Sequence, residues 1–346
     1  VFKSQADTER IKILKFGGKS LANGEGLERV LKIIQTRANK KEHFAVVVSA
    51  RGNATDDLEN LLDLAASGED FKSALEAFAA YQKNNFKGVD IDAELQTIER
   101  ILNGVSLTGD YSLKTKDEIL AFGELISAKV ITSLLNANGL KAKLFDSRKL
   151  IKTDDTFSNA EVDQSASKEN VIRYFHNLEP NTIAVVTGFI GSSREGATTT
   201  LGRNGSNYSA ALLANFLDAG ELVNYTHVDG IFTANPELVK DAKLIDVISY
   251  SEANELANFG ANILHAKTII PLIEKNIPLR ICNTFNDDNE GTLIGPKTDN
   301  GGIKSLSVLD NMALINLEGR GLLGKVGVDM RIFRALGQNG ISVGIV

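Results

Sequence analysis

A glycine-rich turn that carries one arginine, residues 202–206 (Gly-Arg-Asn-Gly-Ser), runs directly into an apolar segment with helical periodicity. Ser206 is expected to be the N-cap of that helix, whose free backbone amides and positive dipole end favour an anion. The guanidinium of Arg203 would add a bidentate cation at the same place. The turn therefore predicts a site for a carboxylate or a phosphate.

A second turn, residues 15–20 (Lys-Phe-Gly-Gly-Lys-Ser), follows an apolar strand near the start of the chain. Its Gly-Lys-Ser ending is that of a P-loop, but the first glycine of that motif would fall on Ile13, so the spacing excludes a P-loop. What remains is either a common strand-to-helix turn or a phosphate-binding turn, whose contacts would come from Lys15, Gly17, Gly18 and Lys19. Two anion-binding turns indicate an enzyme that holds two anionic ligands together.

Further candidates lie at the ends of other elements. Thr55 either caps the helix that follows residues 49–54 or directs its hydroxyl at a ligand. Glu124 interrupts the apolar side of a helix, so it is either solvated or an acceptor for a substrate ammonium. The loop 226–236 either holds a nucleotide or is a plain turn, and residues 259–265 are, by spacing alone, a corner between two helices.

Composition narrows the function classes. The 346 residues carry a net charge of −6 without a basic cluster, which argues against nucleic-acid binding. Cys282 is the only cysteine, so no disulfide or thiolate metal site forms within the chain. No run of about 18 apolar residues and no signal peptide is visible, so a cytoplasmic protein away from membranes is expected. Because the chain starts at Val1, the native start is expected to precede it.

The periodicity predicts an α/β fold. Short apolar runs typical of buried parallel strands cover residues 11–14, 45–48, 142–145, 182–186, 222–225 and 279–281. Helical patterns alternate with them from about residue 26, at 115–139 with a capping box at Thr115, and at 206–218, 251–259 and 265–276. Such alternation predicts a three-layer αβα sandwich with a mainly parallel sheet. Residues 56–107 read as a helical insertion with a packing role alone.

A polar, turn-rich stretch at residues 296–302 is typical of a linker. It divides the chain into a unit at 1–298 and a smaller one at 303–346. The smaller unit predicts a strand at 312–317, a helix at 326–336 and a strand at 341–346. This βαβ fragment would leave an open sheet edge, so we expect the chain to be truncated.

These segments, in this order, resemble the aspartate kinases of the amino-acid-kinase family over roughly residues 10–346. The wording of the turns is most similar to the kinase part of bifunctional aspartokinase–homoserine dehydrogenases, and the tail is similar to the first half of an ACT regulatory domain. The resemblance implies an amino-acid-kinase fold that transfers the γ-phosphoryl group of ATP, with Mg²⁺ bridging the phosphates, to the side-chain carboxylate of L-aspartate.

The resemblance also assigns residues. Lys15 would contact the phosphoryl oxygens, and Gly17 and Gly18 would donate amides. The residues implied to hold aspartate are Ser49, Thr55, Glu124, Arg203 and Ser206. The remaining nucleotide contacts implied are Lys19, Thr226, His227, Phe232, Asn262 and Ile263.

The chain departs from the family pattern at three polar positions. Asn207 and His227 stand where the family has aspartates, and Asn262 stands where it has a lysine. Lys19 occupies a threonine position, so we hypothesise that Lys19 supplies the cation that Asn262 does not, which would make Lys15, Lys19 and Asn207 the catalytic group.

Two alternatives stay open. The departures favour a catalytically weak kinase-fold module that binds an amino acid for regulation, and a related kinase acting on glutamate or a carbamate is the other reading. The ACT-like tail implies a homo-oligomer and feedback by threonine or lysine.

Overall fold

The computed structural model describes residues 10–22, 24–84, 89–258, 266–286, 288–296, 302–308, 313–316, 327–339, 341 and 343. Among these residues no helix combines the length and the apolar character that crossing a bilayer requires.

The core of the molecule is an eight-stranded sheet with the order β3-β5-β2-β1-β8-β10-β11-β9. The six predicted strands are present as β1 (Lys12–Phe16), β2 (Phe44–Val48), β3 (Ala142–Phe145), β5 (Ile183–Thr187), β8 (Glu221–Thr226) and β10 (Leu279–Asn283). These six pair in parallel, which confirms the mainly parallel sheet. Two unpredicted strands, β9 (Val247–Ser249) and β11 (Thr292–Gly295), extend the sheet. Among the described strands of this sheet, only the β10–β11 pair is antiparallel.

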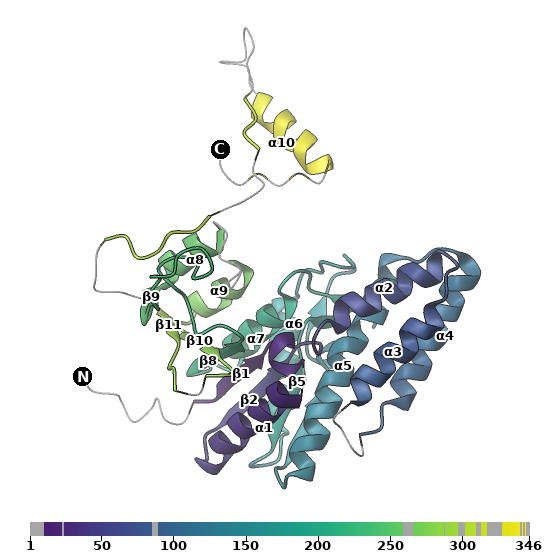
Figure 1. Cartoon of the computed structure of the whole chain (residues 1–346), viewed down its shortest axis with the longest axis horizontal. Coiled ribbons are helices and arrows are strands. Elements are labelled where there is room, and N and C mark those ends of the chain that lie inside the picture. The colour runs from purple at the N-terminus through teal and green to yellow at the C-terminus, as the bar shows by residue number, and fades with distance from the viewer. Residues whose placement is uncertain are drawn as a thin grey trace.

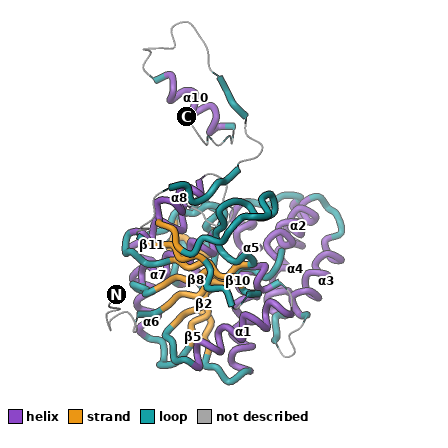
Figure 2. The backbone as a smooth tube through the Cα atoms, turned by 60° about the vertical axis from the view of Figure 1, so that its left-hand side comes forward, coloured by secondary structure: helices purple, strands orange, loops and turns teal. Residues whose placement is uncertain are grey.

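Helices cover both faces of this sheet (Figures 1 and 2). The helices on the face that includes Leu14 and Val46 are α1 (Gly24–Asn39) and α5 (Leu113–Ala137). The helices on the face that includes Ile13 and Val47 are α6 (Gln164–His176), α7 (Gly205–Phe216), α8 (Tyr250–Asn258) and α9 (Ala266–Ile273). Adjacent residues of one strand thus enter opposite cores, as the twofold repeat of a strand requires, and the three-layer αβα prediction is confirmed.

The predicted helical insertion forms three helices, α2 (Ala54–Ala66), α3 (Phe71–Lys83) and α4 (Asp92–Thr108). They lie beside α5 on the outer side of one helical layer (Figure 1). A second, three-stranded sheet of β4 (Lys152–Thr153), β6 (Ile190–Ser193) and β7 (Thr198–Thr200) was not predicted. Its last strand ends directly before the Gly-Arg turn, so it helps to place that turn. Two 3₁₀ helices, η2 (Gly18–Leu21) and η3 (Ser147–Lys149), follow β1 and β3.

Three predicted helix starts are wrong by one to three residues. Helix α7 begins at Gly205 after Asn204, whose φ of 58° is left-handed, so Ser206 lies inside the first turn. Helix α5 begins at Leu113, because Ser112 accepts the Thr115 amide and is the actual cap. Helix α2 begins at Ala54, so Thr55 is no cap either. A hydroxyl freed from capping can face a ligand instead.

The C-terminal unit is described only in part. The predicted helix is present as α10 (Val328–Gln338), and none of its residues is buried. The predicted strands are wrong at the described residues, because 313–316, 341 and 343 are not in strands. Strands need a paired neighbour, and the amide of Ile341 instead donates to Leu336 O at the end of the helix.

Candidate active site

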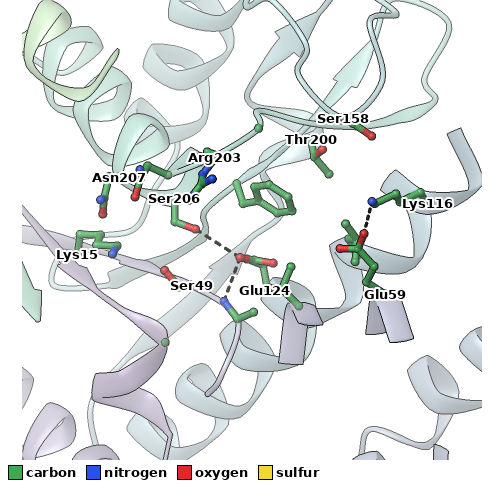
Figure 3. A pocket seen from close by; sticks show the side chains of 18 of the residues that line it. Lys15, Ser49, Glu59, Lys116, Glu124, Ser158, Thr200, Arg203, Ser206 and Asn207 are labelled. Atoms are coloured by element: carbon green, nitrogen blue, oxygen red, sulfur yellow. Dashed lines mark hydrogen bonds and ion pairs between the residues drawn. The ribbon is translucent and has the colours of Figure 1, made fainter. Parts of the chain in front are cut away.

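A cavity of about 490 Å³ lies where the ends of β1 and β2 meet the start of α7 (Figure 3). Eight of the residues predicted for the site line it, namely Lys15, Gly18, Ser49, Thr55, Glu124, Arg203, Ser206 and Asn207. The two anion-binding turns therefore face one cavity, although 182 or more residues separate them in the sequence. This position outside the carboxyl ends of parallel strands is where open α/β sheets bind ligands.

Lys15 is the fourth residue of β1 and is buried. Burial lowers the pKa of its ammonium to about 8, and the carboxylate of Glu124 raises that pKa to a smaller extent. Among the described residues no carboxylate forms an ion pair with Lys15. A cation in this position is available to a negatively charged ligand.

Glu124 lies on the buried side of α5, with 3% of its surface exposed, so the solvated alternative is wrong. Its Oε1 accepts from the Ala50 amide at 3.0 Å and from Ser206 Oγ at 3.3 Å. Its Oε2 is buried and has no hydrogen-bond partner among the described residues. Burial raises the pKa of Glu124 to about 8. A ligand ammonium would supply both the missing partner and the charge that keeps the carboxylate ionised.

Backbone geometry explains why glycines flank Arg203. Gly202 has a φ of 74°, and a Cβ on Gly205 would lie 2.7 Å from the ring of Phe189. The exposed Arg203 side chain extends from this turn into the wall of the cavity (Figure 3) and forms no ion pair with a described residue. Its guanidinium can bind a carboxylate bidentately.

The two glycines of the first turn differ. Gly17 donates its amide to Tyr225 O at 3.2 Å, so the expectation that this amide binds phosphate is wrong. Gly18 lines the cavity, and a Cβ on it would lie 2.7 Å from Ala50 O. The close approach of two loops, together with access to the ligand, requires glycine at position 18.

The expected nucleotide contacts form a separate group beside this cavity. The pairing of β1 with β8 brings the exposed Lys19 to His227, with Nζ 3.4 Å from Nε2. Thr226 Oγ1 lies 3.3 Å from the other ring nitrogen of His227, while Phe232 pairs with Leu244 in the loop beyond. None of these four residues lines the cavity. Asn262 and Ile263 lie outside the described residues.

The family model of the amino acid kinase family matches residues 10–283. The chain belongs to the amino acid kinase family. It is 33% identical to the lysine-sensitive aspartokinase 3 of Escherichia coli, and the match covers 97% of this chain and 76% of that relative. It is 34% identical to a bifunctional aspartokinase/homoserine dehydrogenase of Haemophilus influenzae, with 96% of this chain and 42% of the relative covered. The chain thus spans about two fifths of the length of that bifunctional relative.

A solved structure gives the same family. The crystal structure of E. coli aspartokinase III in complex with aspartate and ADP (R-state) superimposes with a TM-score of 0.80 and 32% identity, and covers 97% of this chain and 76% of that one. The fold and the order of its elements are therefore those of an amino acid kinase.

Sequence reasoning missed part of this kinase-family cavity. Its further lining residues include Glu59, Lys116, Ser158, Phe189, Thr200 and Asn204. Lys116 of α5 forms an ion pair with Glu59 of α2, and both line the cavity, so the insertion contributes a side chain to the cavity wall in addition to its packing. Glu59 and Lys116 have only a weak signal in the sequence, because neither of them lies in a glycine-rich turn.

The arrangement suits an amino acid with an acidic side chain. Glu124 can accept an ammonium, and Arg203 can bind a carboxylate. Lys15 supplies a second cation, for another anionic group, at another part of the same wall. Three charges of this sign pattern match a dicarboxylic amino acid with a phosphoryl donor beside it.

Proposed function

We propose that this amino acid kinase is an aspartate kinase. A side-chain carboxylate oxygen of L-aspartate attacks the γ-phosphorus of ATP. The bond between the γ-phosphorus and the oxygen that bridges it to the β-phosphorus breaks, and 4-phospho-L-aspartate and ADP result. The observation that carries the proposal is the meeting of Lys15, Glu124 and Arg203 in one cavity. The similarity to an aspartokinase bound to aspartate and ADP supports it. The reaction is proposed to take place in the cytoplasm.

The side chains of the cavity have separate roles in this proposal. Glu124 accepts the ammonium of aspartate, and Arg203 binds a carboxylate, with Ser49, Thr55 and Ser206 completing the contacts. Lys15 neutralises charge that develops on the transferred phosphoryl group, which is the main task of the protein in such reactions. Asn207 lies beside Lys15 and offers a neutral amide in place of a carboxylate.

The nucleotide is proposed to bind beside the cavity. Its contacts would come from Gly18, Lys19, Thr226, His227, Phe232, Asn262 and Ile263. Lys19 serves as the second cation. Mg²⁺ enters with ATP as part of the substrate. Phosphate oxygens and water are its usual ligands at kinase sites, and no described group of three acidic, histidine or cysteine side chains could enclose a metal ion.

Phosphorylation of a panel of acidic amino acids tests the proposal. With ATP and Mg²⁺, aspartate should give the acyl phosphate, trapped as the hydroxamate, while glutamate gives little. Arg203→Ala should lower kcat/KM for aspartate roughly a hundredfold, the equivalent of about 2.7 kcal/mol. Arg194→Ala is the matched control, since Arg194 is exposed and pairs with Asp163 away from the cavity. The absence of an ATP-dependent product, or equal activity of the two variants, would exclude this assignment.

A second candidate is a module with weak turnover that binds an amino acid. The observation in its favour is the neutral Asn207 beside a buried Lys15. Calorimetric titration separates the two candidates. A working kinase binds both Mg-ATP and aspartate, whereas the module binds the amino acid alone.

Residues 303–346 are proposed to be part of an ACT-like regulatory unit that follows a catalytic unit at 1–298. The amphipathic α10 supports this division, because its apolar side chains Met330 and Phe333 are 57% and 44% exposed and so are free to pack on a partner. We infer a homo-oligomer through this region and feedback by lysine or threonine. A related structure, E. coli aspartokinase III, is a complex with lysine and aspartate. Sedimentation with each amino acid, and inhibition by each, test both inferences.

A further inference from the structure

A second, much smaller cavity of about 10 Å³ lies behind Lys15. Its polar lining consists of Lys15, Asn207, Asn224 and Thr268, and its apolar lining of Ala210, Leu222 and Leu279. Lys15 and Asn207 also line the large cavity. The small cavity therefore shares two residues with the proposed site of phosphoryl transfer.

The fold brings these four polar residues together from four elements. Lys15 of β1 and Asn224 of β8 are direct partners in the parallel register. They therefore point to the same face of the sheet, the face on which α7 and α9 pack. Helix α7 supplies Asn207, and the first turn of α9 supplies Thr268.

Three polar atoms at this cavity are unsatisfied. Asn207 Oδ1, Asn224 Oδ1 and Thr268 Oγ1 are buried and have no hydrogen-bond partner among the described residues. Buried polar atoms are nearly always hydrogen-bonded to protein or to ordered water, so three such atoms at one small cavity require an explanation. Half of the six buried unsatisfied side-chain atoms found among the described residues are at this single place.

We propose that one ordered water molecule occupies this cavity and links the Lys15 ammonium to Asn207, Asn224 and Thr268. The volume fits a single water, and a buried water needs two to four polar partners. The four polar neighbours also match the two donor and two acceptor positions of one water molecule. The water donates to the two amide oxygens and accepts from the ammonium and from the threonine hydroxyl, which uses all four of its positions.

The water makes Asn224 and Thr268 positioning residues for Lys15, and this role rests on the proposed kinase function. The ammonium donates one hydrogen bond to this water, which is held by uncharged side chains, so its remaining N–H groups face the large cavity. The titratable group that faces Lys15 there is Glu124 of α5. The neighbours from α7, β8 and α9 named above carry no titratable group, so a change in this network acts on Lys15 through hydrogen bonding alone.

A crystal structure of the full chain tests the water site without reference to activity. Electron density for one water is expected within about 2.7–3.2 Å of Asn207 Oδ1, Asn224 Oδ1, Thr268 Oγ1 and Lys15 Nζ. A cavity without density, in a structure that shows other internal waters, overturns the proposal. Direct contacts of the ammonium with both amide oxygens overturn it as well.

Two variants test the positioning role. Thr268→Val removes one partner of the water, and Asn224→Leu removes another while filling the cavity. Asn224→Leu displaces the water, so it should lower kcat about tenfold and move the alkaline limb of the kcat–pH profile to lower pH, because the charged ammonium loses its acceptor. Thr268→Val leaves the water three partners, so both changes should have the same direction and be smaller. Thr268→Ser should restore both properties.

Thr182→Val is the matched control. Thr182 Oγ1 is another buried, unsatisfied hydroxyl, but it lies just before β5, at the opposite end of the sheet strands. An equal shift of the pH profile in this control, or unchanged profiles in both test variants, contradicts the positioning role. If the wild-type chain transfers no phosphoryl group, the proposed function fails while the crystal structure still decides the water site.

Discussion

Two buried carboxylates seven residues apart on α5 have opposite hydrogen-bonding states. Asp117, with no exposed surface, accepts four hydrogen bonds, from the amide and hydroxyl of Ser158 at 2.8 and 3.2 Å and from those of Thr200 at 2.9 Å each. Glu124 accepts from Ala50 and Ser206 through one oxygen, and its other oxygen has no partner among the described residues. A carboxylate whose two oxygens both accept hydrogen bonds from the protein stabilises the structure around it. A carboxylate with one oxygen unpaired can accept a hydrogen bond from a ligand.

The two neighbourhoods are connected through the cavity wall. Ser158 and Thr200, which Asp117 binds, both line the cavity, and Thr200 lies three residues before Arg203. Asp117 therefore determines where the arginine-bearing turn lies, without touching the ligand itself. Glu124, two turns further along the helix, faces the space that this turn encloses (Figure 3).

The sharpest test of this contrast is Glu124→Gln. Glutamine keeps an acceptor for the Ala50 amide but carries no charge, so it cannot form an ion pair with an ammonium. Loss of one partner of a buried charge pair costs about 4 kcal/mol, so kcat/KM for aspartate should fall roughly a thousandfold. Steady-state kinetics with aspartate at saturating ATP measure this loss.

The same variant lowers activity but should remove a pH-dependent loss of stability that the wild-type chain shows. Because burial raises the pKa of Glu124 from 4.5 to about 8, the folded state keeps a proton that the unfolded state has lost between these pH values. The wild-type free energy of unfolding therefore falls as pH rises through this window, and the glutamine variant lacks this decrease. Urea denaturation at pH 5 and pH 8 checks the sign. A variant less stable than wild type at pH 8 would show that Glu124 is structural, like Asp117.

Asp117→Ala should affect stability most. It leaves two backbone amides and two hydroxyls without their acceptor, and we expect a loss of about 3 kcal/mol in the free energy of unfolding. Asp117→Asn should lose only about 1 kcal/mol, because one amide oxygen can accept both backbone amides while the NH₂ group donates to the two hydroxyls. Urea denaturation of both variants measures the difference. Equal losses would show that charge, and not the number of acceptors, makes Asp117 stabilising.

The sequence allowed the sheet and the turns to be predicted for a simple reason. The six central strands are buried on both faces, so each is a short apolar run, and the turns that follow β1 and β7 carry glycines that close contacts require. The three short strands β4, β6 and β7 have no such pattern. Asp117 binds Thr200 of β7 and Ser158 of a nearby loop, which lie 83 and 41 residues away in the sequence, and β6 and β4 are joined to β7 through strand pairing.

The two carboxylates could not be distinguished in advance for the same reason. Both interrupt the apolar side of one helix, and only the fold shows which of them has partners. The neighbourhood of Lys15 is equally nonlocal, because its register partner Asn224 lies on a strand more than 200 residues later. The predicted starts of α5, α7 and α2 were wrong for a local reason. The residues that precede these helices, Ser112, Asn204 and Asn53, are suited to capping as well as the nearby hydroxyl residues that were predicted.

The pH dependence of turnover extends the comparison to the cation. Lys15 must be protonated to neutralise phosphoryl charge, and burial lowers its pKa to about 8. The value of kcat should therefore fall about tenfold per pH unit above this pKa. Lys15→Arg should flatten the alkaline limb, since a guanidinium stays charged, although its lower absolute rate reflects the changed geometry. An alkaline limb that persists in the arginine variant would assign it to another group.

The smallest expected effect belongs to Lys19. The hypothesis that Lys19 supplies the cation that Asn262 does not gives Lys19 the role of a second cation. Its side chain is exposed and lies beside His227, so its surroundings are close to water. A charge there is worth about 1 kcal/mol at 4 Å, so Lys19→Ala should lower kcat only about fivefold, and Lys19→Arg should retain most of the activity. Single-turnover kinetics with Mg-ATP measure this step directly. A hundredfold loss would mean that Lys19 enters a desolvated site when the nucleotide binds, and full activity of the alanine variant would leave Lys15 as the cation on which transfer depends.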